Sequence, residues 1–350
     1  MSKVKCAVLG ASGVVGQNFL RLLVNHPYFE LGAICASDSR VGKPLSSAQP
    51  QIEGGIPTCF RDLIFDPIDV DILLSKEIQV VFSGLPSDVA KEIETEAARK
   101  GLKVFSNAGS HRMDADVPIL IPEVNHPHLQ LTEKQDTDGF IVTNANCTTT
   151  GLTMALLPIQ QFDIKKLVVA SYQAISGAGY PGIPSMDIIS NVIPYISSEE
   201  PKMVEECRKI YGSVHGSTIE PTSWEIYPHC VRVQTIIGHL ISVHAEIANP
   251  TTLEAVKEAI LTYESPKEVA GLPTAPEKPV LYTEETARPQ PRWDIYAGTP
   301  DRARGQAVVI GRLSVENNII RFITLSNNLI RGAAGGSVLN AELAYRKNLL

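Results

Sequence analysis

The chain has 350 residues, of which 44% are hydrophobic and 20% charged, and this length suits two packed domains better than one. The formal net charge of −7 argues against a general nucleic-acid binder, and no apolar run approaches the length that spans a membrane. The six cysteines show neither a Cys-x-x-Cys pair nor zinc-site spacing, so we expect a reduced, cytoplasmic protein with no metal site.

The first predicted element is a buried strand over residues 4–9, which leads into Gly10-Ala-Ser-Gly13-Val-Val-Gly16. Apolar residues at helical spacing then predict a helix over 14–25. Strand, glycine turn and helix in this order are typical of a dinucleotide-binding fold, because glycines permit a tight turn and free N–H groups at a helix start can bind a pyrophosphate. The spacing here is G-x-x-G-x-x-G, which is less common than G-x-G-x-x-G.

A second strand is predicted over residues 31–36, and it ends at Ser37-Asp38-Ser39-Arg40 with Lys43 beyond. A hydroxyl and two cations suit the 2′-phosphate of NADP. Asp38 points the other way, because an acid at this place can accept a ribose hydroxyl. The alternative for Arg40 and Lys43 is a solvated loop.

Further strands are predicted over 80–86, 103–108 and 140–142, with a helix over 87–100, while residues 46–76 form a connecting excursion. Alternating strands and helices predict a parallel sheet. We therefore predict an α/β protein whose Rossmann-type nucleotide domain covers residues 1–146.

Beyond residue 147 the pattern changes to a second, largely antiparallel sheet in an α+β domain over residues 147–330. A proline-rich surface excursion follows over 265–293, and an apolar helix within 331–350 is expected to complete the nucleotide domain. The strands of the second sheet are predicted over 167–173, 231–236, 239–247, 308–315 and 319–325.

Cys147 follows a predicted strand and opens a predicted helix, where Thr148, Thr149 and Thr150 can cap free N–H groups. A thiol at the positive end of a helix dipole has a lowered pKa and is a nucleophile. The alternative is a small buried hydrophobic residue. Beside a nucleotide domain, an activated cysteine suggests hydride transfer through a thioester.

Such chemistry needs a base and a clamp for the fixed charges of the substrate. Arg232 precedes His239 by seven positions, so an arginine that binds a carboxylate and a histidine that exchanges a proton with sulfur are both available. Glu199-Glu200-Pro-Lys202 enters a predicted helix over 203–211, and it either holds a zwitterionic substrate or caps a solvated helix.

The chain resembles aspartate-semialdehyde dehydrogenases, and more closely their archaeal and fungal branch, over nearly its whole length. The matching blocks are Gly10-Ala-Ser-Gly-Val-Val-Gly16, Asn146-Cys147-Thr, Gln173-Ala-Ile-Ser-Gly-Ala-Gly179, Glu199-Glu-Pro-Lys202, Arg232 with Gly238-His239, and Gly332-Ala-Ala-Gly-Gly336.

The resemblance implies NADPH-dependent reductive dephosphorylation of L-4-aspartyl phosphate to L-aspartate-4-semialdehyde and phosphate through a cysteine thioester. This reaction leads towards lysine, threonine, methionine and isoleucine. It also implies that residues 147–330 form a catalytic and dimerisation domain and that the protein is a homodimer or homotetramer.

The resemblance further assigns roles to single residues. Cys147 is the implied nucleophile, His239 the acid/base, Gln173 the residue that orients the intermediate and Asn146 an oxyanion donor. The implied substrate residues are Arg232 for the carboxylate, Glu199 for the amine, and Arg112 and Lys202 for the phosphate. The implied NADP-binding residues are Gly10, Ser12, Gly13, Val14 and Val15 at the pyrophosphate, Ser37 and Arg40 at the adenosine phosphate, Ser83, Ser176 and Gly177 along the cofactor, and Asn328 at the carboxamide.

Two features depart from the family pattern. Thr235-Ile-Ile-Gly238 is less polar than the expected approach to the histidine, and the Glu199-Glu200 pair leaves open which carboxylate meets the amine. One alternative function is a malonyl-CoA reductase, whose substrate lacks the α-amine. A second is reduction of N-acetylglutamyl phosphate, whose signature we do not recognise around Cys147. A third is a non-catalytic NADP-binding sensor, which gives no reason for Cys147, His239, Gln173 and Arg232 to occur together.

Overall fold

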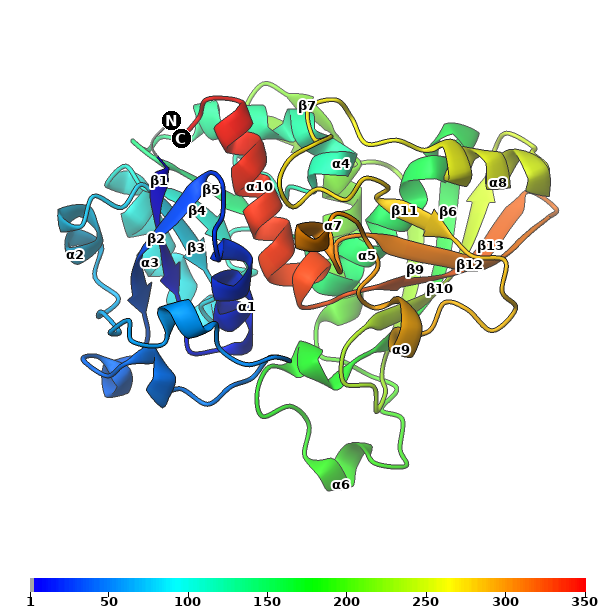
Figure 1. Ribbon diagram of the computed structural model, residues 1–350. Coiled ribbons are helices and arrows are strands. Elements are labelled where there is room, and N and C mark those ends of the chain that lie inside the picture. Colours follow the sequence, from blue (N-terminus) through cyan, green and yellow to red (C-terminus); the bar gives the residue numbers. More distant parts are fainter. Residues whose placement is uncertain (1–2) are drawn as a thin grey trace.

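A five-stranded parallel sheet forms the core of the N-terminal part of the chain in the computed structural model, which describes residues 3–350 (Figure 1). Its strand order is β2-β1-β3-β4-β5, which confirms the predicted Rossmann-type sheet. Each strand is short and apolar because helices cover both faces of the sheet. The strands are β1 (Val4–Leu9), β2 (Phe29–Cys35), β3 (Val80–Ser83), β4 (Lys103–Ser106) and β5 (Phe140–Thr143).

Alternating residues of this sheet enter two different hydrophobic clusters. On one face, Phe82 and Phe105 pack with α1 (Val14–Leu23) and with α10 (Gly335–Arg346). On the other face, Val81 and Val104 pack with α2 (Val70–Ser75) and α3 (Ser87–Arg99). The C-terminal helix α10 therefore lies in the core of the N-terminal sheet, at the centre of the molecule in Figure 1.

Two of the expected excursions contain more structure than predicted. Residues 46–76 include α2, which begins at a side-chain cap: Asp69 accepts hydrogen bonds from the backbone N–H groups of Asp71 and Ile72. Residues 265–293 do not simply lie on the surface. Val269 and Leu272 are buried in the core cluster that contains α10, so the proline-rich segment packs against the nucleotide side.

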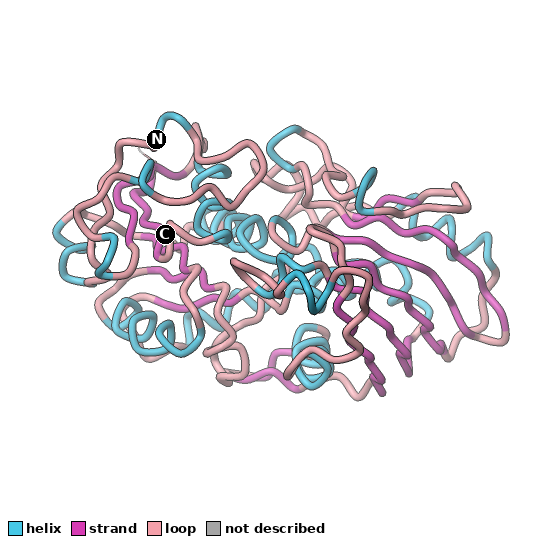
Figure 2. Tube along the Cα trace, turned by 90° about the horizontal axis from the view of Figure 1, so that it is seen from below, coloured by secondary structure: helices cyan, strands magenta, loops and turns pink. Residues whose placement is uncertain are grey.

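The second sheet has six strands in the order β11-β12-β13-β10-β6-β9, and Figure 2 shows them side by side at the end of the molecule remote from both termini. Three of its neighbouring pairs are antiparallel and two are parallel, which confirms the largely antiparallel prediction. The strands are β6 (Ile164–Gln173), β9 (Glu225–Arg232), β10 (His239–Ile247), β11 (Val280–Tyr282), β12 (Val308–Glu316) and β13 (Ile319–Ser326).

One predicted strand is wrong. Residues 231–236 were expected to pair in the sheet, but β9 ends at Arg232 and the chain then turns back to β10. The turn includes Gly238 with φ +108°, a conformation that a residue with a side chain rarely adopts.

The two faces of the six-stranded sheet differ. One face is covered by three helices, and Met203, Cys207 and Val256 of these helices share a cluster with the strands. The other face carries the exposed side chains of Val168 and Tyr227. The covering helices are α5 (Cys147–Leu156), α7 (Glu199–Ile210) and α8 (Leu253–Thr262).

The remaining α-helices and β-strands are short. They are β7 (Ser213–His215) paired with β8 (Thr218–Glu220), and the single-turn helices α4 (Pro122–Asn125), α6 (Ser185–Ile188) and α9 (Pro291–Asp294). Across residues 3–350, no helix is both long and apolar enough to cross a membrane.

Candidate active site

The candidate nucleophile lies where the two sheets meet. The chain leaves β5 at Thr143 and enters α5 at Cys147, while Gln173 and Arg232 occupy paired positions at the ends of β6 and β9. His239 opens β10, the strand on the other side of β6. Residues far apart in the sequence therefore converge because three strands of one sheet end at the same edge.

The structure brings Cys147 and His239 into contact. The Sγ atom of Cys147 lies 3.1 Å from Nε2 of His239. The other ring nitrogen, Nδ1, accepts a hydrogen bond from the backbone N–H of Ala174 at 3.1 Å. From these bonds we assign the proton of the neutral ring to Nε2, so that Nε2–H donates to the sulfur.

Burial keeps this histidine neutral. Desolvation, with a further contribution from the nearby Arg232 cation, lowers the pKa of His239 to about 3, against a smaller opposing effect of the Gly238 carbonyl. Ala174 also fixes Arg232, because its carbonyl accepts Nη1 of that guanidinium at 2.7 Å. The backbone of a single residue, Ala174, thus orients the side chains of both His239 and Arg232.

The predicted pKa of the thiol is wrong for the chain without substrate. Burial raises the pKa of Cys147 to about 12, and the Glu199 carboxylate adds to the rise. Arg112 and Arg232 oppose it. A helix start favours thiolate, but here the loss of solvation is the larger effect, so the resting sulfur is a thiol.

The cap of α5 also differs from the prediction. Asn146, and not the threonines, caps the helix: its Oδ1 accepts the N–H groups of Thr148 and Thr149 at 2.9 and 3.3 Å. A cap of this kind stabilises a helix by about 1 kcal/mol. The Nδ2 group of Asn146 donates to Glu199 at 2.8 Å, so one of its two N–H bonds is already used. The oxyanion role of Asn146 stays a prediction.

The structure distinguishes the two neighbouring glutamates. Glu199 faces the candidate site, where its carboxylate accepts hydrogen bonds from Asn146 and, at 3.2 Å, from Nε2 of Gln173. Glu200 points to the sheet and accepts the backbone N–H of Cys230 at 3.1 Å. Of the pair, Glu199 is therefore the carboxylate available to a substrate.

The two predicted phosphate cations have different surroundings. Arg112 is almost fully buried and donates to the Asn144 carbonyl and to the Glu206 carboxylate. It lies close enough to Cys147 to lower the pKa of the thiol. Lys202 is exposed near the start of α7, so its assignment to the phosphate rests on the resemblance.

The glycine turn has the shape that a bound dinucleotide requires. Gly10 has φ +75°, and a Cβ atom at Gly16 would lie 2.2 Å from the Gly10 oxygen, so a larger residue does not fit. The first helical turn has no side-chain cap, which leaves N–H groups for a pyrophosphate. Ser12, Val14 and Val15 are partly exposed on this turn.

The other predicted cofactor residues fall into two groups. Asn328 and Ser176 lie together beside the histidine, since Nδ2 of Asn328 donates to Ser176 at 2.9 Å and its Oδ1 accepts the N–H of Gly238 at 2.8 Å. Gly177 packs on the same place: a Cβ there would lie 2.9 Å from Nη1 of Arg232.

At the far end of the turn, Ser37 and Arg40 are at least partly exposed after β2, and they suit a phosphate. Ser83 is fully buried at the end of β3, so its contact with the cofactor stays a prediction. Taken together, the residues present fit NADP. No group of three or more His, Cys, Asp or Glu side chains within residues 3–350 is placed to hold a metal ion.

Sequence reasoning missed a buried set of charges behind the site. Glu206 joins Arg112 to the backbone N–H of Asn146 at 2.6 Å. Lys209 donates to three carbonyls of the loop that carries Arg112. The spacing of Glu199, Glu206 and Lys209 places them on one face of a helix, but charges at helical spacing also describe an ordinary solvated face.

Sequence reasoning also missed a buried ion pair next to the segment that packs against Cys147. Arg331 and Glu123 form a buried two-bond ion pair at 2.8 and 2.6 Å. The next residue, Gly332, approaches Cys147 so closely that a Cβ atom would lie 2.6 Å from that of the cysteine.

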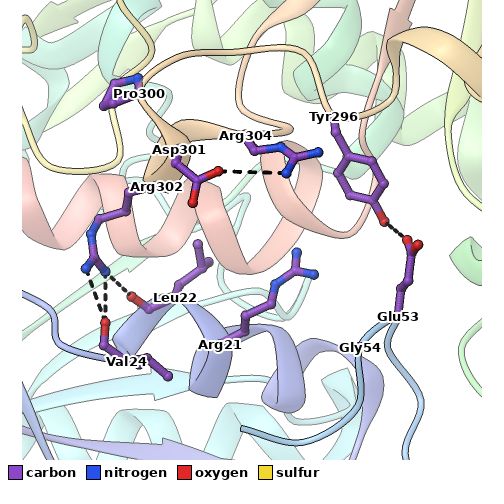
Figure 3. A pocket seen from close by; sticks show the side chains of 10 residues that line it. All are labelled: Arg21, Leu22, Val24, Glu53, Gly54, Tyr296, Pro300, Asp301, Arg302 and Arg304. Atoms are coloured by element: carbon purple, nitrogen blue, oxygen red, sulfur yellow. Dashed lines mark hydrogen bonds and ion pairs between the residues drawn. The ribbon is translucent and has the colours of Figure 1, made fainter.

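A large cavity lies elsewhere, at the junction of the two domains (Figure 3). It has a volume of about 700 Å³ and contains neither Cys147 nor His239. Contacts between the domains cross it: Tyr296 donates to Glu53 at 2.6 Å, and Arg302 donates to the Leu22 carbonyl at the end of α1 at 2.9 Å. These contacts hold the domains together at a distance from the chemistry.

Comparison with known proteins gives a consistent result. A family model for the NAD-binding domain of semialdehyde dehydrogenases matches residues 5–132, and one for their dimerisation domain matches residues 156–331. The chain is 42% identical over 349 residues to the aspartate-semialdehyde dehydrogenase of Archaeoglobus fulgidus, with 98% of each chain covered. It is 37% identical to the malonyl CoA reductase (NADP) of Metallosphaera sedula, over 99% of this chain and 98% of that one.

Among solved structures, aspartate-semialdehyde dehydrogenase of Candida albicans with NADP matches with a TM-score of 0.88 and 34% identity over 100% of both chains. The parallel nucleotide sheet, the two matched semialdehyde dehydrogenase domains and the neighbour solved with NADP define an NADP-dependent oxidoreductase. The chain belongs to the aspartate-semialdehyde dehydrogenase family.

Proposed function

We propose that the protein reduces L-4-aspartyl phosphate to L-aspartate-4-semialdehyde with NADPH and releases phosphate. The observation that carries this proposal is the 3.1 Å contact between Cys147 and His239, made beside two arginines at the mouth of a nucleotide fold. The named archaeal and fungal relatives support the choice of substrate.

The residues divide the reaction among them. The Cys147 sulfur attacks the acyl carbon, a C–S bond forms, the bond from that carbon to the phosphate oxygen breaks, and the thiol proton leaves with the phosphate. Arg112 binds the departing phosphate, and Lys202 adds a second cation from the exposed start of α7. NADPH, when bound, supplies the hydride that reduces the thioester to the aldehyde level. The C–S bond then breaks, and Nε2–H of His239 stabilises the sulfur that leaves.

Three side chains position the substrate. Arg232 presents a guanidinium to the α-carboxylate, with one of its N–H groups held by the Ala174 carbonyl. Glu199 accepts a hydrogen bond from the α-ammonium group of the substrate. Gln173 holds Glu199 in place through a hydrogen bond and also orients the bound acyl group. Because Arg232 and Gln173 are almost fully buried, their interactions with a bound substrate are stronger than they would be in solution.

An assay in both directions tests the proposal. We expect phosphate-dependent reduction of NADP with aspartate semialdehyde, and no oxidation of NADPH with malonyl-CoA. Turnover with malonyl-CoA but not with aspartate semialdehyde would contradict the proposal. It would indicate an acyl-CoA reductase, whose substrate has no amine for Glu199 to bind. Absence of turnover with either substrate, with NADPH still bound, would indicate a nucleotide sensor.

We also propose that the protein is a cytoplasmic homodimer and that two copies pair through the uncovered face of the six-stranded sheet. Val168 and Tyr227 are paired across β6 and β9 and are 47% and 54% exposed there, and exposed apolar side chains that lie together mark an interaction surface. The match to a dimerisation domain over this part of the chain supports a second copy as the occupant.

Sedimentation of the variant Val168→Lys tests this interface. A buried, unpaired ammonium on β6 is expected to convert the dimer into monomers at micromolar concentration. Glu258→Lys, at an exposed position of α8, serves as the control, because α8 covers the opposite face of the sheet. A variant at Val168 that stays dimeric would place the interface elsewhere.

A further inference from the structure

The loop that carries Arg112 has no regular secondary structure. Between β4 and α4, residues 107–121 form turns with a few backbone hydrogen bonds and one isolated bridge, from Ile119 to Thr143. Side chains from other elements add further contacts to this loop. The most extensive of these contacts comes from Lys209 on α7.

Lys209 is 5% exposed, and its Nζ donates to the carbonyls of Arg112, Asp114 and Val117 at 2.7, 2.7 and 2.8 Å. An ammonium group has three N–H bonds, and here each has its own carbonyl acceptor. A lysine that only stabilised the fold would be expected at the surface, because burying an ammonium is costly. Lys209 instead joins three carbonyls of one loop to a single ammonium group.

The Arg112 side chain is fixed just as completely. Its Nε, Nη1 and Nη2 atoms donate to the Asn144 carbonyl, the Glu206 carboxylate and the Asn107 carbonyl at 2.8, 3.0 and 2.9 Å. A guanidinium has five N–H bonds, so one remains on Nη1 and one on Nη2. Two free N–H bonds on neighbouring nitrogens match the spacing of two phosphate oxygens.

Glu206 links this arrangement to the nucleophile. One of its oxygens accepts Arg112, and the other accepts the backbone N–H of Asn146 at 2.6 Å, directly before Cys147. Lys209 lies almost one turn further along the same helix. The side chain and the backbone of Arg112 are therefore both held by α7, the helix that also presents Glu199 at its start.

We propose that Lys209 and Glu206 are positioning residues that hold Arg112 ready for the phosphate of the acyl phosphate substrate. Lys209 fixes the backbone of the arginine, and Glu206 fixes its guanidinium at a set place relative to the sulfur. This inference rests on the proposed function, because it concerns the phosphate that the reaction releases.

The charge of Lys209 gives the arrangement a pH dependence. Burial lowers the pKa of Lys209 to about 8, although Asp114, Asp116 and Glu206 favour the charged form. Arg112 faces it as well, through the shared loop. Above this pH the neutral amine has only two N–H bonds for three carbonyls, so one contact with the loop is lost. Affinity for phosphate is expected to fall as pH rises through 8.

The test measures the KM for phosphate in the oxidative direction. Lys209→Met keeps the length of the side chain and removes all three bonds. We expect the phosphate KM to rise about tenfold or more, the effect of one misplaced charge-assisted hydrogen bond. The KM for NADP should stay within about twofold, and the additional loss of phosphate affinity above pH 8 should disappear.

Two further variants make the result specific. Glu206→Gln keeps an oxygen for the N–H of Asn146 but removes the anion that holds Arg112, and a smaller rise in the phosphate KM is expected. Arg208→Met on the same helix removes a bond to the Trp224 carbonyl and should leave the phosphate KM unchanged. If Lys209→Met does not fold, Glu206→Gln against Arg208→Met decides the question.

A phosphate KM within twofold of the wild type in both Lys209→Met and Glu206→Gln would overturn the inference. So would equal increases in the KM for phosphate and for the aldehyde, which indicate general damage. If the wild type shows no phosphate-dependent turnover, the proposed function itself fails. In that case, phosphate protection of Cys147 from iodoacetamide still tests the inference, since a protection midpoint in Lys209→Met that equals the wild-type value contradicts it.

Discussion

The nucleotide turn and the catalytic edge lie close together but are built from different parts of the chain. The turn uses backbone: Gly10 and Gly16 permit a close approach, and free N–H groups do the binding. The catalytic edge uses side chains from strands and helices that are distant in sequence, such as Cys147 and His239. The glycine turn can bind a ligand because side chains are absent there. The reactivity of the catalytic side chains depends instead on the groups that surround each of them.

The largest effect that separates the two regions is expected from Cys147→Ala. Loss of the nucleophile removes the thioester route, so kcat should fall by at least about 10⁴-fold. Binding of NADPH, followed by its fluorescence, should be unchanged, because the sulfur contributes nothing to the glycine turn. Loss of NADPH binding in this variant would mean that Cys147 is structural and that the two regions are not independent.

The reverse separation is expected from Gly16→Ala. The added Cβ would meet the Gly10 oxygen and the Cα of Ala11, and backbone atoms cannot move aside as a flexible side chain can. We expect the KM for NADP to rise about tenfold to a hundredfold as bonds to the pyrophosphate are lost. The rate at which iodoacetamide alkylates Cys147 should not change.

Gly13→Ala provides the matched control for that change. A Cβ at Gly13 lies 3.5 Å from the Gly10 oxygen, an ordinary contact, so this variant should unfold at the wild-type temperature. If Gly16→Ala binds NADP as tightly as the wild type, the turn tolerates a side chain, and cofactor binding there does not depend on bare backbone.

The smallest effects concern the charges around the thiol. Glu199 raises the pKa of Cys147, so Glu199→Gln should lower it and speed alkylation several-fold at pH 8. Arg112 lowers the pKa, so Arg112→Met should raise it and slow alkylation. Because thiolate forms only as pH approaches the pKa, the wild-type rate should still be rising with pH at pH 10. Equal rates in both variants would show that these charges do not reach the sulfur.

The two regions also differ in how well the sequence predicts them. The glycine turn is local, so its spacing and its flanking strand and helix are sufficient. The predicted roles of Cys147, His239 and Gln173 come from motif resemblance, which substitutes for knowledge of long-range contacts. Lys209 was missed because its role depends on three carbonyls of a loop about ninety residues earlier, and no local pattern reveals them.

The failed predictions have the same origin. The thiol pKa was expected from the helix start alone, but it depends on burial by residues from several elements. The threonines after Cys147 are good caps by type, and the structure uses the asparagine before it. The segment over 265–293 has the composition of a surface loop, yet Val269 and Leu272 reach a core formed by distant elements.

The approach of Gly332 to Cys147 has a consequence for the order in which the protein is made. Gly332 lies just before α10, the helix that packs on the first sheet. The strands of both sheets precede this segment in the sequence. The thiol therefore acquires its contact with Gly332 only after every strand has been synthesised, and a chain that stops before residue 332 carries the nucleophile without that contact.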